Sequence, residues 1–78
     1  MADNDDIQAI LAQNVQKFRK QVGLSQEKLS TLCELHHSYV GRLERNGGNP
    51  ELSTMKRLAD RLGVTVIDLL TPPKRRSR

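Results

Sequence analysis

The side chains best suited to specific hydrogen bonding gather between His37 and Arg45. Val40 and Leu43 lie three residues apart, so a helix through this stretch would turn both toward the protein interior. The opposite side would then carry small, polar or basic residues that can enter a groove and hydrogen-bond there: His37, Ser38, Tyr39, Gly41, Arg42 and Arg45. An arginine presents several N–H donors in a rigid plane, which suits the recognition of bases and phosphates.

The chain offers little to an enzyme. It has no Ser/His/Asp set, no glycine-rich phosphate loop and no carboxylate pair placed for acid–base work. Cys33 and His36 form a C-x-x-H pair beside His37, but a metal site needs more ligands than the nearby sequence supplies. Cys33 also fits the apolar stripe of its helix. We therefore predict a buried thiol, no metal, no cofactor and no enzymatic activity.

Two short helices joined by a tight turn are predicted to position the polar face. Between Ser25 and Asn46 the apolar residues recur at steps of three or four within each helix: Leu29, Leu32, Cys33, Leu35, Val40 and Leu43. The connection around residues 34–37 is so short that the two helices must cross steeply and share a core. This is the layout of a helix-turn-helix whose recognition helix lies near residues 37–45.

The rest of the chain is predicted to form three more helices and no strand. They run over residues 7–22, from about 52 to 62, and over 66–70. Three local signals mark the helix ends: Gly23 can take the left-handed conformation that ends the first helix, Ser25 can act as an N-cap, and Thr65 with Asp68 can form a short capping box. We expect an all-α, five-helix domain over residues 7–71, with a flexible acidic N-terminus at 1–6 and a flexible basic tail at 72–78.

Length and charge narrow the classes of partner. A chain of 78 residues forms one small domain, and such domains often gain stability by oligomerising. No apolar run is long enough to cross a membrane, the N-terminus does not read as a signal peptide, and one cysteine excludes an internal disulfide. We therefore expect a cytoplasmic protein. Its net charge of +4, with four bases among the last five residues, suits a polyanionic partner.

Four segments resemble a known family in order and spacing. They are G-L-S-Q-E-K-L at 23–29, S-Y-V-G-R-L-E-R at 38–45, N-P-E-L at 49–52 and L-A-D-R-L-G-V at 58–64. Over residues 10–70 the chain resembles the Cro and phage-repressor-like helix-turn-helix proteins of the xenobiotic-response-element type. It is most similar to restriction–modification controller proteins. The resemblance implies a compact five-helix domain that binds double-stranded DNA, usually as a dimer.

The resemblance also implies roles for individual residues. Gln26, beside Ser25 at the start of its helix, matches a position that meets a DNA phosphate, while His37, Ser38 and Arg42 match positions that read bases. Tyr39 would lie against the sugar–phosphate backbone or pack on the domain surface. The loop after the recognition helix would touch phosphates. The implied DNA-binding set is Ser25, Gln26, His37, Ser38, Tyr39, Arg42, Arg45, Asn46 and Asn49.

Two further groups of residues are assigned structural roles. The family pairs an arginine late in the first helix with a glutamate late in the recognition helix, which implies an Arg19–Glu44 ion pair. Val66, Ile67 and Leu69 offer more apolar surface than one small domain needs, so we place the dimer interface there. Two residues depart from the family: Ser30 stands where a small residue such as alanine is usual, and Glu34 where glycine is usual.

These observations predict a homodimeric regulator that binds a near-palindromic operator. The sequence leaves open whether it is a restriction–modification controller, an antitoxin-like autorepressor or a phage-type repressor. A different class, a protein-interaction adaptor with a helix-turn-helix fold, would predict no preferred DNA sequence. Whether the tail from Lys74 to Arg78 wraps onto DNA also stays open.

Overall fold

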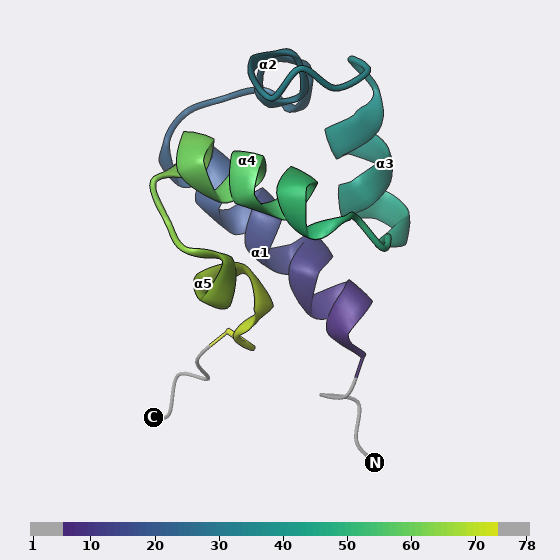
Figure 1. The fold of residues 1–78 in the computed structure, drawn as a ribbon, viewed down its shortest axis with the longest axis vertical. Helices are drawn as coiled ribbons and strands as arrows, with labels where there is room; N and C mark the ends of the chain where they lie inside the picture. The colour runs from purple at the N-terminus through teal and green to yellow at the C-terminus, as the bar shows by residue number, and fades with distance from the viewer. Residues whose placement is uncertain (1–5, 74–78) are drawn as a thin grey trace.

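Five α-helices joined by short connections make up the domain in the computed structural model, which describes residues 6–73 (Figure 1). They are α1 (Ile7–Gln21), α2 (Gln26–Leu32), α3 (Tyr39–Asn46), α4 (Leu52–Leu62) and α5 (Val66–Leu70). No strand occurs in this part of the chain, so the predicted all-α, five-helix fold is confirmed. The acidic residues 1–5 and the basic tail 74–78 lie outside the described residues.

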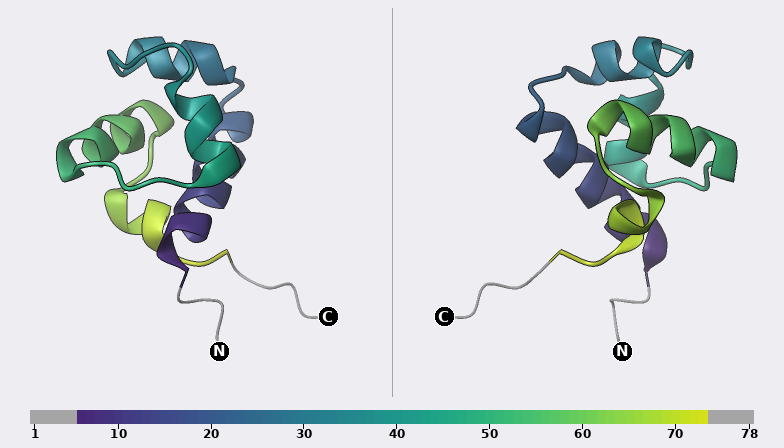
Figure 2. Two further views of the ribbon diagram at one scale, coloured as in Figure 1. Left: turned by 90° about the vertical axis from the view of Figure 1, so that its right-hand side faces the viewer. Right: turned by 60° about the vertical axis from the view of Figure 1, so that its left-hand side comes forward.

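Helix α1 is the element around which the others pack. It contacts α3, α4 and α5, while α2 lies over α3 and α4 (Figures 1 and 2). All five helices send apolar side chains into one core, among them Val15, Leu29, Val40, Leu58 and Leu69. The helix pair α2–α3 therefore stands on a base formed by the other three helices, and its outer surface is left open.

The ends of the helices follow the sequence cues. The Ser25 hydroxyl accepts the Lys28 N–H at 3.0 Å at the start of α2. Thr65 and Asp68 form the predicted capping box of α5, with bonds of 3.0 and 2.9 Å. Gly23 and Gly63 take the left-handed conformation after α1 and α4. Helix α1 ends at Gln21, one residue earlier than predicted, with Val22 as its C-cap.

The recognition helix begins later than the prediction near residue 37. The regular helix α3 starts at Tyr39, and His37 and Ser38 form a turn before it. His36 organises this turn, because its Nδ1 accepts the Ser38 N–H at 3.2 Å and its carbonyl accepts the Tyr39 N–H at 2.9 Å. Glu34 has a φ of 62°, so a non-glycine residue occupies the left-handed conformation at the position where the family usually has glycine.

Asn14 is a buried polar residue that sequence reasoning missed. Its side chain is fully buried, and Nδ2 donates to the carbonyl oxygens of Leu69 and Thr71 at 2.8 Å each and of Asp68 at 3.3 Å. These carbonyls belong to the end of α5, where the last turn of a helix has no internal donors. Asn14 therefore ties the short α5 to α1.

We expect Asn14→Ala to lower the free energy of unfolding by about 2 kcal/mol, because it removes the buried amide that donates to these carbonyls and leaves a small void. Urea unfolding followed by circular dichroism measures the change. Gln13→Ala is the control, since Gln13 is exposed on the same helix. A loss no larger than that of the control would show that α5 needs no anchor.

Candidate nucleic-acid interface

A row of linked polar side chains runs from the turn before α3 onto the outward face of that helix. The Ser38 hydroxyl lies 2.7 Å from His36 Nδ1 and accepts a hydrogen bond from Arg42 Nη2 at 3.3 Å. Arg42 and Arg45 are both exposed. The row holds the Arg42 guanidinium beside the start of the helix, where its remaining N–H groups face solvent and can meet a base or a phosphate.

His37 stands at the junction of α2 and α3 rather than on the face of α3. Its Nδ1 lies 3.5 Å from Glu27 Oε2, and its ring stacks on His36 with centroids 4.4 Å apart. Both members of the His37–Glu27 pair are exposed. The exposed His37 side chain is accessible to a ligand, but it projects from the turn before α3 and not from the helix itself.

Tyr39 packs partly on the domain surface. Its ring is half-buried against the core, and it lines a shallow hollow with Arg42, Asn46 and Asn49. Burial first, and the nearby Glu51 carboxylate second, raise the pKa of the Tyr39 hydroxyl above 10.0. The hydroxyl is therefore a neutral donor at physiological pH, and it stands beside the predicted phosphate-contacting loop.

The loop after α3 is held close to the first helix. Gly47 has a φ of 73°, and a Cβ there would come within 3.2 Å of the Gln8 carbonyl oxygen. Only glycine fits both the conformation and the space. The exposed side chains of Arg45 and Asn46 lie in the last turn of α3, and that of Asn49 lies in the loop that follows.

A buried ionic network joins α1, α2 and α3 beneath this face. Arg19 Nε and Nη2 contact the two carboxylate oxygens of Glu44 at 2.6 and 2.9 Å, and the two side chains are only 10% and 2% exposed. The Gln26 amide also donates to Glu44, at 2.8 Å. One N–H of the half-buried Gln26 amide is thus occupied inside the protein. The network fixes the orientation of the recognition helix.

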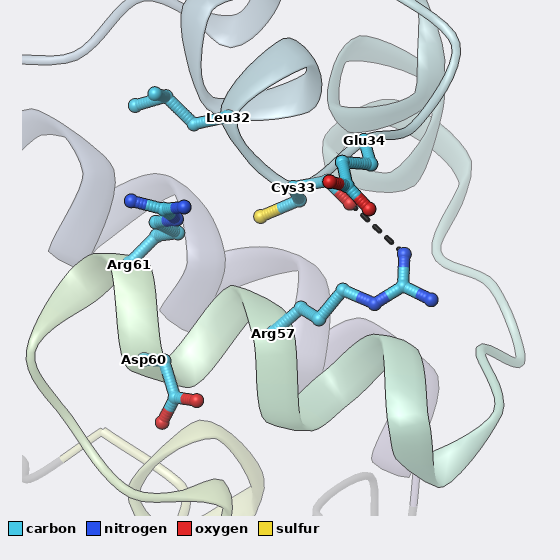
Figure 3. A pocket seen from close by; sticks show the side chains of 6 residues that line it. All are labelled: Leu32, Cys33, Glu34, Arg57, Asp60 and Arg61. Atoms are coloured by element: carbon cyan, nitrogen blue, oxygen red, sulfur yellow. Dashed lines mark hydrogen bonds between the residues drawn. The ribbon is translucent and has the colours of Figure 1, made fainter.

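Arg57 of α4 supports the turn between α2 and α3, another contact that sequence reasoning missed. Its Nη1 donates to the Cys33 carbonyl at 3.0 Å, at the end of α2 (Figure 3). The pocket beside it is lined by Leu32, Cys33, Glu34, Arg57, Asp60 and Arg61. Its lining includes both acidic and basic side chains.

The prediction of a buried thiol at Cys33 is confirmed. Its side chain is 1% exposed, and burial raises the pKa of the thiol while Arg61 and Arg57 oppose that shift. The neutral thiol is the form that packs against the core. Within residues 6–73 no three histidine, cysteine or acidic side chains gather as metal ligands would.

The apolar surface predicted for a dimer needs one correction. Leu69 is fully buried in the core of the single chain, so it offers no surface to a partner. The five-residue α5 turns Leu69 inward and leaves Ile67 75% exposed. Ile67 borders an apolar hollow shared with Ala59, Val64 and Val66. We therefore retain Val66 and Ile67 and remove Leu69 from the proposed interface.

A membrane-spanning role finds no support in the described part of the chain. None of its five helices combines the length and the apolar character that crossing a bilayer requires.

Comparison with known proteins places this geometry among DNA-binding regulators. Residues 15–69 match the model of the Helix-turn-helix family. Control protein C.SmaI from Serratia marcescens is 46% identical over 85% of this chain and 79% of its own length. The crystal structure of hypothetical transcription factor NHTF from Neisseria superposes with a TM-score of 0.85 at 41% identity, covering 94% of this chain and 84% of that one.

A restriction–modification controller is also among the similar structures. C.AhdI from Aeromonas hydrophila superposes with a TM-score of 0.72 at 36% identity, covering 78% of this chain and 92% of that chain. The similarity thus extends over the helix pair α2–α3 and the helices that support it. The predicted resemblance to this family and to its controller proteins is confirmed.

Proposed function

This chain belongs to the helix-turn-helix family of DNA-binding transcription regulators, and we propose that it acts as a homodimeric restriction–modification controller on a near-palindromic operator. The observation that carries the proposal is the exposed polar row of α3, fixed on a buried ionic network. Similarity to C.SmaI and C.AhdI supports the controller role. A regulator of this kind works on DNA in the cytoplasm and catalyses no reaction.

In the proposed complex α3 enters the major groove. Arg42 contacts guanine O6 and N7 with two N–H groups, the commonest specific pairing between arginine and a base. Ser38 and His37 reach the neighbouring base edges. These three residues choose the sequence, because base edges differ in the major groove from one pair to the next.

Phosphate contacts frame the reading helix on both sides. Ser25 and Gln26 stand at the start of α2, while Arg45 and Asn46 stand in the last turn of α3 and Asn49 in the loop after it. Tyr39 adds a neutral hydroxyl at the edge of that loop. Contacts of this kind set orientation and affinity and make binding sensitive to salt.

The second copy docks through the end of the domain that carries α5. Ile67 is a large apolar side chain left in water, and the hollow beside it has a mainly apolar lining. Burying an isoleucine side chain stabilises an interface by about 2 kcal/mol on each partner. A twofold contact there would present two α3 helices to successive major grooves, about 34 Å apart.

We expect Ile67→Lys to convert the dimer to a monomer at micromolar concentration, because it places two charges where two apolar side chains meet. Sedimentation velocity measures the change. Leu52→Lys is the matched control, since Leu52 is 73% exposed on the surface at the start of α4. Equal effects of the two substitutions, or a wild-type monomer, would place the interface elsewhere.

Footprinting on selected DNA tests the function as a whole. Sequences enriched from a random pool should contain two inverted half-sites with centres 10–10.5 base pairs apart, roughly one helical turn, or a multiple of this spacing. Both half-sites should be protected together. A single asymmetric half-site would overturn the homodimeric proposal, and a pool without enrichment would overturn sequence-specific binding.

A further inference from the structure

Ser30 of α2 makes a buried hydrogen bond to the recognition helix. Its side chain is fully buried, and its hydroxyl oxygen accepts the Val40 N–H at 3.0 Å. The same hydroxyl donates to the Gln26 carbonyl at 2.9 Å. Val40 is the second residue of α3, and its N–H belongs to the first turn, where the helix itself supplies no acceptor.

The recognition helix lacks the usual cap of its own. Ser38 occupies the N-cap position, yet its side chain accepts no hydrogen bond from the backbone of α3. Its hydroxyl instead faces His36 Nδ1 at 2.7 Å and Arg42 Nη2 at 3.3 Å on the outer surface. The acceptor that a serine N-cap normally provides comes here from the neighbouring helix.

We propose that Ser30 is a positioning residue for DNA reading: it caps α3 from inside and thereby leaves the Ser38 hydroxyl free to hold Arg42. The DNA part of this inference rests on the proposed function. The cap itself is a property of the free protein. It links α2 and α3 at the point where they cross, one turn of α2 after Gln26, whose amide is bound to Glu44.

Removing the Ser30 hydroxyl has one of two consequences, and each of them disturbs the start of α3. If the Ser38 side chain stays in place, the buried Val40 N–H has no acceptor, which loosens the first turn of α3. If Ser38 rotates inward to supply an acceptor, it releases Arg42. Either outcome weakens the contact with a specific sequence. Alanine is shorter than serine and favours helices, so Ser30→Ala still allows α2 to form.

Amide hydrogen exchange of the free protein tests the cap. In Ser30→Ala the exchange rate at Val40 should rise about tenfold more than the rate at Val15, which reports on the core, because a side-chain cap is worth roughly one factor of ten. Thr31→Val is the matched control. Its hydroxyl donates to the Lys28 carbonyl at 3.1 Å on the exposed side of the same helix, away from α3. Equal changes at Val40 and Val15 would overturn the cap.

Binding to a selected operator tests the positioning role. Ser30→Ala should lower the ratio of operator affinity to random-duplex affinity about tenfold, whereas Thr31→Val should leave it unchanged. Adding Ser38→Ala should lower this affinity ratio less in the Ser30→Ala background than in the wild type, because both hydroxyls act through the position of Arg42. An unchanged ratio or strictly additive losses would overturn the positioning role. If the wild type prefers no sequence, the proposed function fails, while the exchange result still decides the cap.

Discussion

Glu44→Ala is expected to lower the free energy of unfolding by about 3 kcal/mol. The substitution leaves the Arg19 guanidinium largely buried without its carboxylate partner, which had accepted bonds of 2.6 and 2.9 Å. It also removes the acceptor of the Gln26 amide. Urea unfolding gives the value directly, and the loss of three hydrogen bonds that join α3 to α1 and α2 makes this the largest stability effect that we predict.

An exposed ion pair provides the matched control. Lys56 and Asp60 lie 2.7 Å apart on α4, but their side chains are 67% and 59% exposed, so Asp60→Ala should cost less than about 1 kcal/mol. The double variant Arg19→Met with Glu44→Leu should recover most of the lost stability, because it removes both charges. A Glu44→Ala loss as small as that of Asp60→Ala would show that the pair is unimportant to the fold.

Arg42→Ala is expected to reduce affinity for the selected operator by roughly 10- to 100-fold, in keeping with the loss of one bidentate contact to a base. Affinity for random duplex should change far less. Arg42→Lys should not restore the preference, because an ammonium group lacks the paired, planar donors of a guanidinium. Competition titrations with operator and random duplex at fixed salt measure both quantities.

Arg45 offers the comparison within the same helix. We assign it to phosphate, so Arg45→Ala should weaken operator and random duplex alike and should reduce the salt slope by about one. A uniform loss for Arg42→Ala as well would remove Arg42 from the reading set. If the protein is instead a protein-interaction adaptor, the wild type should prefer no DNA sequence, so none of these substitutions could alter such a preference.

The sequence was sufficient for features that depend on neighbouring residues. Apolar spacing gave the five helices, because one buried face repeats every three or four positions. Ser25, Gly23 and the Thr65–Asp68 pair marked helix ends through bonds that span at most three residues. The burial of Cys33 followed from the same periodicity.

Contacts between distant segments were beyond this reasoning. Asn14 and Arg57 look like surface residues in the sequence, and only the packing of α5 on α1 and of α4 on α2 gives them carbonyl partners. In the sequence Ser30 is only a departure from the family, whereas in the structure its hydroxyl accepts the Val40 N–H and so caps α3. Leu69 is one of three apolar residues that exceed the apparent needs of one small domain, and the five residues of α5 are too few for their spacing to show that Leu69 is buried.

The most direct test of the account is a titration of the wild-type protein against duplex DNA from directly upstream of its own gene. The titration is repeated at several salt concentrations with an excess of random competitor. We expect tight binding that survives the competitor and weakens steeply as salt rises, because base contacts and phosphate contacts act together. Binding that the competitor abolishes at every salt concentration, on this duplex and on sequences selected from a random pool, would contradict it.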